Sequence, residues 1–259
     1  LGLLNLKCHL IDNLDKIGGQ CAELYPEKPV YDIPSRARIT GEELIGELML
    51  QAKPFDPVFH LNQQADSIEK VGEEWKLTTS SNTVIQARCI VIAAGAGSFV
   101  PRRPPLENIE LFENTSVFYS VRDKSKFKDK KILIVGGGDS ALDWVNDLAS
   151  IADVTLMHRR KEFRASPDSV TKMLELEKNN KIKFVYGQLD SLSGNEKNLN
   201  AVKYKHEDEE FSIEVDYLLP FFGLKMELGP IANWGINLHE NLIKVDTEKF
   251  ETSVPSIFA

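Results

Sequence analysis

Residues 130–145 read KKILIVGGGDSALDWV, with a glycine turn, Gly136-Gly137-Gly138-Asp139-Ser140-Ala141, in the middle. The apolar run Lys130–Val135 predicts a buried strand, and the periodic apolar residues after the turn predict a helix over Ser140–Ile151. A second strand is expected over Val154–Met157. This order of strand, glycine turn, helix and strand is typical of the βαβ unit that binds a dinucleotide.

The turn has the chemistry of a phosphate site. Glycines let the backbone approach a pyrophosphate closely, and the start of a helix attracts negative charge. We therefore expect Gly136, Gly138, Asp139 and Ser140 to lie at a bound nucleotide. A glycine turn alone is weak support, because such turns also join strands to helices without binding anything; the flanking elements strengthen the interpretation.

The second strand leads into His158-Arg159-Arg160, and Arg164 follows shortly after. The residue that closes this strand of a βαβ unit meets the adenosine ribose. Guanidinium groups pair with phosphate through charge-assisted hydrogen bonds, so arginines at this place favour NADP over NAD. The alternative is that these residues are ordinary surface cations.

An earlier strand, Leu6–Ile11, ends instead in a carboxylate, Asp12, shortly before Gly18-Gly19-Gln20. A carboxylate at a strand end accepts hydrogen bonds from ribose hydroxyls and repels a 2′-phosphate, so we expect a second nucleotide such as FAD. Asp12 would otherwise cap the next turn. For the loop aromatics Tyr25 and Phe99, core packing is the alternative to stacking on a cofactor.

The rest of the chain predicts an α/β protein with two Rossmann-like, three-layer dinucleotide-binding domains, each with a small β-meander. One meander is expected over 66–87, and Thr40 with Glu43 predicts a capping box for a helix over Gly41–Gln51. We expect an FAD domain over residues 1–120 and 224–259, with an NADP domain over 121–223 inserted into it. The crossings are expected near 119–123 and 222–226.

Composition narrows the function classes. The 259 residues carry a net charge of −8, which argues against a nucleic-acid or anionic-membrane surface, and we find no apolar run long enough for a transmembrane helix. The three cysteines, Cys8, Cys21 and Cys89, form no CxxC pair, which suits the cytoplasm. No metal-ligand cluster and no nucleophile–base set is recognisable, so we expect neither a metal site nor a catalytic side chain.

Several motifs together resemble the thioredoxin-reductase-like ferredoxin–NADP reductases. The resemblance is carried by Gly18-Gly19-Gln20, Leu24-Tyr25-Pro26-Glu27-Lys28, Tyr31-Asp32-Ile33, the stretches 136–144 and 158–165, Leu219-Pro220-Phe221-Phe222-Gly223 and 229–235. It implies FAD, NADP(H) and a homodimer, with Asp12, Gln20, Tyr25, Ala65 and Phe99 at FAD and Tyr25 stacked on the flavin ring. The family's first glycine turn and its closing Gly-Asp segment do not occur in the sequence, so we expect the chain to be part of a longer one.

The resemblance also indicates the reaction. Thioredoxin reductases carry a CxxC before the second glycine turn, whereas this chain reads VFYSVRD over 117–123. We therefore expect electrons to leave from the flavin itself, between NADP(H) and ferredoxin or flavodoxin. Two alternatives stay open: a cysteine-free flavin reductase of disulfides or quinones, and a non-catalytic nucleotide-binding protein. The stretch 122–131 holds six cations and two acids, as a solvated segment or a docking patch for an acidic carrier.

Overall fold

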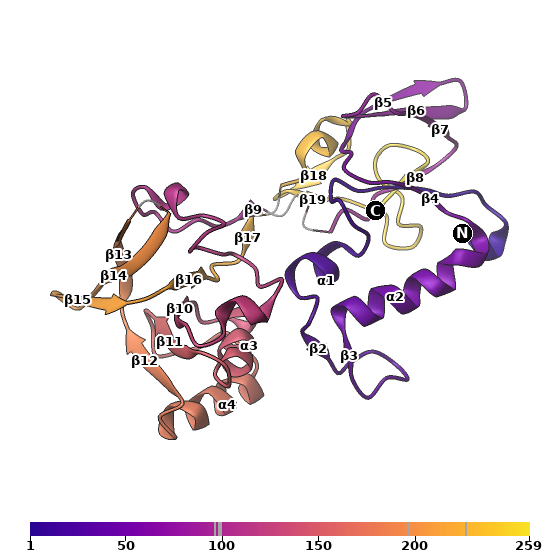
Figure 1. Ribbon diagram of the computed structural model, residues 1–259. Helices are drawn as coiled ribbons and strands as arrows, with labels where there is room; N and C mark the ends of the chain where they lie inside the picture. The colour runs from indigo at the N-terminus through magenta and orange to yellow at the C-terminus, as the bar shows by residue number, and fades with distance from the viewer. Residues whose placement is uncertain (96, 98–99, 196, 226) are drawn as a thin grey trace. The chain divides into compact units, whose positions relative to one another are not determined.

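The computed structural model describes residues 1–95, 97, 100–195, 197–225 and 227–259. The chain forms two compact units, one of Leu1–Val100 with Leu224–Ala259 and the other of Pro101–Gly223. In Figure 1 the indigo start and the yellow end of the chain belong to the same unit, while the magenta-to-orange middle forms the other. The middle of the chain is therefore an insertion in sequence order.

The unit Pro101–Gly223 is built on a four-stranded parallel sheet in the order β12-β11-β10-β16. Its strands are β10 (Lys131–Val135), β11 (Asp153–His158), β12 (Ile182–Tyr186) and β16 (Tyr217–Pro220). The interiors of β10, β11 and β16 are almost continuously buried, as expected for parallel strands covered on both faces, whereas the edge strand β12 is mostly half-buried. The first two match the strands predicted around the glycine turn.

The helices α3 (Asp139–Leu148) and α4 (Pro167–Lys178) pack against each other, α3 against β10 and β11 and α4 against β12. An antiparallel meander of β13 (Gln188–Asn195), β14 (Asn198–His206) and β15 (Glu209–Glu214) forms a further layer. Its Val202 and Tyr204 share a core with Leu133 and Val135 of β10. The unit therefore has three layers: helices, parallel sheet and meander (Figure 1).

This unit begins at Pro101, well before the crossing expected near 119–123. The segment after Pro101 includes the 3₁₀ helix η3 (Ile109–Leu111), and Leu106, Ile109, Phe112 and Val117 all enter the same core as β10 and β14. No local sequence pattern predicts this packing, because the three prolines at 101–105 mark an irregular segment without assigning it to a core. At its other end, this unit stops at Gly223.

The other unit is an assembly of small sheets. Parallel pairs join β1 (His9–Ile11) to β4 (Val58–His60) and β8 (Ile90–Val91) to β20 (Ile257–Phe258). The meander predicted over 66–87 is present as β5 (Ala65–Val71), β6 (Glu74–Thr79) and β7 (Val84–Ala87). Its Trp75 packs with Ile236 and Ile257, so the end of the chain completes this core.

The remaining elements are short. The helices are α1 (Gly19–Leu24), α2 (Gly41–Ala52) and the 3₁₀ helices η1 (Gly2–Leu4), η2 (Lys53–Phe55), η4 (Lys124–Phe127) and η5 (Gly229–Asn233). Antiparallel pairs join β2 (Pro29–Val30) to β3 (Ile39–Thr40) and β18 (Leu238–His239) to β19 (Leu242–Ile243), and β9 (Val100–Pro101) pairs with β17 (Leu224–Lys225).

Helix α2 starts with the capping box that the sequence predicts. The Thr40 hydroxyl accepts a hydrogen bond from the Glu43 amide at 3.2 Å, and the Thr40 amide donates to the Glu43 carboxylate at 2.8 Å. These bonds hold the pKa of Glu43 below its ordinary value, chiefly through the Thr40 amide.

Thr40→Ala should therefore lower the free energy of unfolding by about 1 kcal/mol, measurable by urea denaturation. Thr247→Ala, at an exposed turn, is the control, and equal losses in both would contradict the capping role.

A partly buried polar network, closed by the exposed Arg103, holds the start of the inserted unit. The Tyr119 hydroxyl donates to the Glu113 carboxylate at 2.7 Å, and the Arg103 guanidinium donates to the other oxygen of that carboxylate at 2.6 Å. Burial, and then the bond to Glu113, raise the pKa of Tyr119. The neutral phenol is therefore favoured in the folded state more than in the unfolded state.

This shift predicts a loss of stability in alkaline solution. Below about pH 10, the pKa of an unfolded tyrosine, the phenol is neutral in both states and its contribution is complete. As the pH rises further, the unfolded state ionises first and the free energy of unfolding falls. Tyr119→Phe should flatten this decline in unfolding experiments between pH 9 and pH 11. Curves of equal slope for both proteins would show that Tyr119 is not responsible.

Candidate functional site

The glycine turn and the arginines lie at one edge of the parallel sheet. Strands β10 and β11 are adjacent and parallel, with Val135 opposite Met157. The chain therefore leaves β10 into Gly136 at the same edge at which it leaves β11 into Arg159. Ligands of open α/β sheets bind at this edge, beyond the carboxyl ends of the strands.

Each glycine of the turn meets a different environment. A Cβ at Gly136 would lie 2.8 Å from the carbonyl oxygen of Phe221 and 2.9 Å from the Cβ of Ala141. A Cβ at Gly137 would collide with the imidazole ring of His158. A Cβ at Gly138 would meet no atom within 4 Å. The first two glycines are thus required by packing, and the third leaves open space over its backbone.

Gly138 is also the N-cap of α3, in extended conformation with no side-chain cap. An uncapped helix start beside open space favours an anion, because the backbone amides there point outward and carry partial positive charge. The turn therefore fits the pyrophosphate of a dinucleotide.

The loop that carries the arginines is tied back to the glycine turn. The Arg164 amide donates to the Gly137 carbonyl, and the Ser166 amide donates to the Asp139 carboxylate, each at 2.7 Å. At the start of the loop, the His158 Nε2–H donates to the Glu162 carbonyl at 3.1 Å, and its ring stacks on Phe163 at 5.0 Å. Residues 158–166 and the turn therefore form one packed site.

The arginine side chains themselves are available to a ligand. Arg159, Arg160 and Arg164 are exposed, and none of them forms an ion pair with an acid within the described ranges of the chain. Three cations held beside the start of α3 form a binding site for a second phosphate group. The glycine residues and the arginines predicted for NADP are thus brought together.

Asp139 makes a tertiary hydrogen bond that the sequence does not predict. Its carboxylate faces the Ser166 amide and accepts a hydrogen bond from it. Ser166 is in turn the N-cap of α4, its hydroxyl accepting from the Ser169 amide at 3.3 Å. Asp139 therefore joins the first turn of α3 to the end of residues 158–166, which we call the arginine loop.

The residues predicted for FAD lie in the other unit, except that Phe99 is outside the described residues. Asp12 follows β1, and one oxygen of its carboxylate accepts a hydrogen bond from the Leu14 amide at 3.0 Å. The turn-capping alternative is thus realised by that oxygen. The Gln63 amide donates to the Asp12 carbonyl, which brings Asp12 near the start of β5, where Ala65 lies.

Gln20 lies in the first turn of the short helix α1, and Tyr25 is the C-cap of that helix. The Gln20 amide nitrogen lies beside the turn at Gly95, 3.6 Å from where a Cβ would stand. Tyr25 is half-buried at the end of α1, and the Lys28 ammonium lies 5.1 Å from the centre of its ring. Gly19 has a φ of 53° and would place a Cβ in open space. This second glycine turn is compatible with a bound nucleotide.

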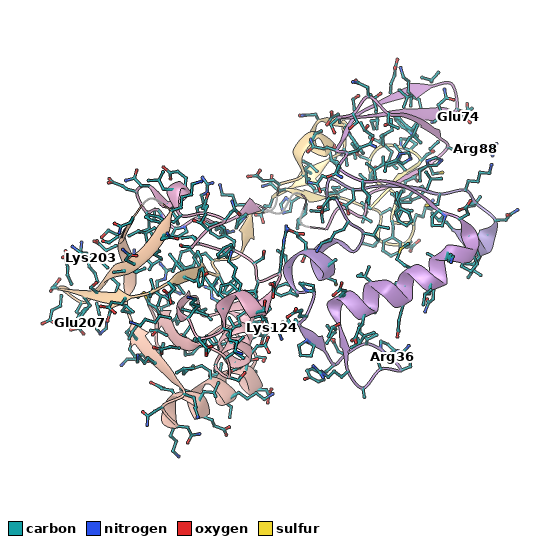
Figure 2. The ribbon with its side chains drawn as sticks, in the orientation of Figure 1. Arg36, Glu74, Arg88, Lys124, Lys203 and Glu207 are labelled. Atoms are coloured by element: carbon teal, nitrogen blue, oxygen red, sulfur yellow. The ribbon has the colours of Figure 1, made fainter. Side chains whose placement is uncertain are left out.

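Much of the charge in the stretch 122–131 is used inside the inserted unit. Lys124, labelled in Figure 2, forms an ion pair with Asp147 of α3 at 3.0 Å. The Lys126 ammonium lies 3.8 Å from the centre of the Phe118 ring, and Lys131 forms an ion pair with Glu214 at 2.8 Å. These contacts favour the structural explanation of the three lysines over the docking patch.

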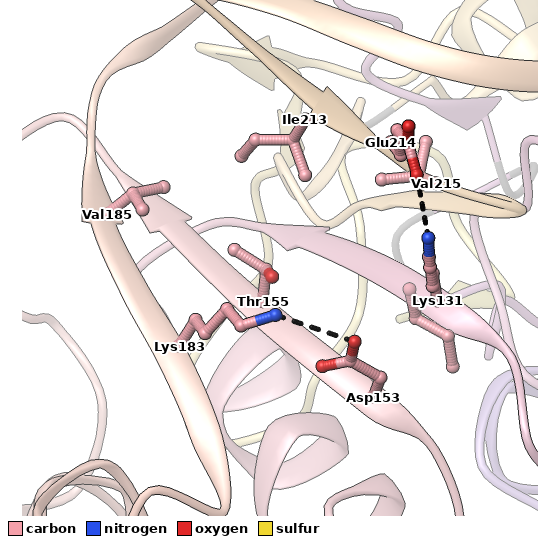
Figure 3. A pocket seen from close by; sticks show the side chains of 9 residues that line it. Lys131, Asp153, Thr155, Lys183, Val185, Ile213, Glu214 and Val215 are labelled. Carbon is pink, nitrogen blue, oxygen red and sulfur yellow. Dashed lines mark hydrogen bonds and ion pairs between the residues drawn. The ribbon is translucent and has the colours of Figure 1, made fainter.

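A cavity of about 310 Å³ lies at the opposite edge of the parallel sheet (Figure 3). Lys131, Asp153 and Lys183, at the starts of β10, β11 and β12, line it together with Ile213 and Val215. The ion pair between Lys183 and Asp153 spans 3.5 Å there. Because this is the amino edge of the strands, the cavity is separate from the nucleotide site.

Sequence reasoning missed three residues of the site: Gly137, His158 and Ser166. The first had a signal, since three consecutive glycines are more than a nucleotide turn needs. His158 stands at the end of the strand, directly before the arginines, and this position alone does not predict that its ring packs against Gly137. The role of the Ser166 amide depends on tertiary structure and has no signal in the sequence.

Comparison with known proteins gives the family. The sequence pattern of the family described as "Pyridine nucleotide-disulphide oxidoreductase" matches residues 25–259. The ferredoxin–NADP reductase of Parvibaculum lavamentivorans is 54% identical over 262 residues, covering 100% of this chain and 76% of the relative. That of Nitrobacter hamburgensis is 52% identical, covering 100% of this chain and 77% of the relative.

Solved structures share the fold. Lactococcus lactis thioredoxin reductase superposes with a TM-score of 0.84 at 24% identity, over 99% of this chain and 82% of that one. The T. acidophilum thioredoxin reductase gives 0.83 at 22% identity, over 97% and 80%. Within the described ranges, no helix has the length and apolar character needed to cross a bilayer. The chain therefore belongs to the pyridine nucleotide-disulphide oxidoreductase family, among the members named ferredoxin–NADP reductases.

Proposed function

We propose that this protein is an FAD-dependent oxidoreductase that transfers electrons between NADP(H) and ferredoxin. The observation that carries the proposal is the arginine loop: three exposed guanidinium groups on a segment bonded to the glycine turn through Gly137 and Asp139. That arrangement recognises a dinucleotide with an additional phosphate on its ribose. Relatives that match the whole chain are named ferredoxin–NADP reductases, and this supports ferredoxin as the electron carrier.

Each group of residues has a role in binding. Arg159, Arg160 and Arg164 would hold the 2′-phosphate, while Gly136, Gly138 and Ser140 at the start of α3 would hold the pyrophosphate. FAD would be held by Asp12, Gln20, Tyr25, Ala65 and Phe99, with Tyr25 stacked on the flavin ring. The open backbone at Gly19 and the carboxylate of Asp12 support this placement.

Bound FAD supplies the electron transfer, since it accepts two electrons as a hydride and returns them singly. The chain contributes binding, orientation and phosphate selection. The segment 117–123, where thioredoxin reductases carry their cysteine pair, has no thiol here, so no disulfide relay is expected at this place. No side chain is assigned an acid–base step.

We assign FAD to the unit formed by both ends of the chain and NADP(H) to the inserted one. Flavodoxin is an alternative one-electron carrier, a homodimer is the expected assembly, and the cytoplasm is the expected location. Gel filtration with light scattering tests the dimer, and kinetics with flavodoxin in place of ferredoxin test the carrier.

A visible absorption spectrum tests the proposed function. The purified protein should be yellow, and anaerobic addition of NADPH should bleach the flavin band, while an equal concentration of NADH should act far more slowly. A colourless protein that ignores NADPH would point to nucleotide binding without catalysis. Bleaching by NADPH followed by turnover with a disulfide or quinone, but not with ferredoxin, would favour the other flavin reductases.

A further inference from the structure

We propose that Asp139 is a positioning residue that sets the selectivity of the site for a nucleotide with a 2′-phosphate. The inference rests on the proposed function and deepens it. A carboxylate beside a phosphate site would be expected to weaken binding by repulsion. A structural role explains its position: the Asp139 carboxylate accepts a hydrogen bond from the Ser166 amide at 2.7 Å and so anchors the end of the arginine loop.

The bond from Ser166 to Asp139 ties the end of the loop to α3, one turn before the Ser169 hydroxyl of α4 donates to the Asp143 carboxylate of α3 at 2.9 Å. Its start is held by His158 and its middle by the bond from the Arg164 amide to the Gly137 carbonyl. Beyond Arg164 the chain is exposed or half-buried until α4 begins at Pro167. The bond between Asp139 and Ser166 therefore fixes the last turn of the loop.

Anchoring matters because ordering a flexible loop costs binding free energy. A loop already held in the binding conformation presents its guanidinium groups without that cost. The pyrophosphate cradle at Gly138 belongs to the turn and not to the loop. Release of the loop should therefore weaken recognition of the 2′-phosphate selectively and leave recognition of the rest of the nucleotide nearly intact.

Two replacements of Asp139 separate positioning from charge. Asp139→Asn keeps an oxygen that accepts the Ser166 amide and removes the negative charge, whereas Asp139→Ala removes both. If the carboxylate acts by position, the alanine variant should bind 2′,5′-ADP about tenfold more weakly than the unaltered protein, equivalent to about 1.4 kcal/mol. The asparagine variant should bind it at least as tightly as the unaltered protein. Binding of 5′-AMP should change less than about threefold in both.

A second pair of variants tests the same bond from its other end. Ser166 has a φ of −57°, which proline adopts without strain, so Ser166→Pro removes the amide donor. Ser166→Ala keeps the amide and removes only the hydroxyl that caps α4. The difference between these two variants in 2′,5′-ADP affinity isolates the amide, and it should match the loss in Asp139→Ala.

The experiment is isothermal titration calorimetry of the full chain with 2′,5′-ADP and with 5′-AMP, together with hydrogen exchange of the Ser166 amide. Asp147→Ala, which removes an acid of the same helix paired with Lys124, is the matched control. The inference is supported if Asp139→Ala loses affinity for 2′,5′-ADP but not for 5′-AMP, and if its Ser166 amide loses protection from hydrogen exchange. Asp139→Asn should keep both the 2′,5′-ADP affinity and the protection of this amide. Equal or tighter 2′,5′-ADP binding by Asp139→Ala, or equal losses for both ligands, overturns the inference alone. If the unaltered protein does not prefer 2′,5′-ADP, the proposed function fails as well.

Discussion

Replacing Arg159 and Arg160 together by alanine will raise the KM for NADPH at least about 100-fold. Each arginine is exposed and has no acidic partner in the part of the chain that the structure describes, so both are free to bind the 2′-phosphate. A hydrogen bond to a charged group contributes about 1.5–3 kcal/mol, and each 1.4 kcal/mol is a factor of about ten. Steady-state kinetics with NADPH and NADH measure the effect.

The comparison with NADH makes this result specific. NADH has no 2′-phosphate, so its KM should change little in the double variant. Lys178→Ala with Lys181→Ala removes the same charge from exposed positions at the end of α4 and should leave both KM values unchanged. If the arginine variant loses NADPH and NADH in equal proportion, Arg159 and Arg160 do not select the phosphate.

Gly137→Ala will destabilise the protein, because Gly137 is required for packing of the site and not for contact with the ligand. Its new methyl group collides with the His158 ring, which is held between the Glu162 carbonyl and Phe163. We expect a loss of about 1–3 kcal/mol in the free energy of unfolding from overpacking, and a fall in NADP affinity because the arginine loop moves with His158. Urea denaturation and calorimetric titration with NADP measure the two effects.

Gly138→Ala is the matched comparison. Gly138 has a φ of −104°, and an added Cβ meets nothing within 4 Å, so the free energy of unfolding should fall by at most about 1 kcal/mol, because alanine is a poorer N-cap than glycine. NADP affinity should still fall, because the methyl group occupies space that the pyrophosphate needs. In the double variant Gly137→Ala with His158→Ala, removal of the His158 ring should restore part of the stability that Gly137→Ala alone loses. Equal behaviour of the two glycine variants would contradict the distinct roles assigned to them.

Much of the architecture could be predicted because its signals are local. The glycine turn between two apolar runs marks β10, α3 and β11, and Thr40 with Glu43 marks the start of α2 through contacts three residues apart. The meander in 65–87 follows from short strands separated by turns. These features depend on nearest neighbours in the sequence, which is why periodicity and capping rules identify them.

The features that were missed depend on residues far apart in the chain. Phe112 and Val117 join the core of the inserted unit through contacts with β10 and β14, so the unit begins earlier than expected. The bond between Asp139 and Ser166 joins two helices across 27 positions. Similarly, Lys131 finds Glu214 only after the sheet has formed. No local pattern encodes such partners.

We propose that this protein passes electrons from NADPH to a one-electron carrier without a dithiol. The decisive measurement is the reduction of cytochrome c by NADPH, with and without ferredoxin and after alkylation of the three cysteines. We predict reduction that requires ferredoxin, is far slower with NADH and survives alkylation. Reduction that ferredoxin does not stimulate, or that alkylation abolishes, would contradict the claim.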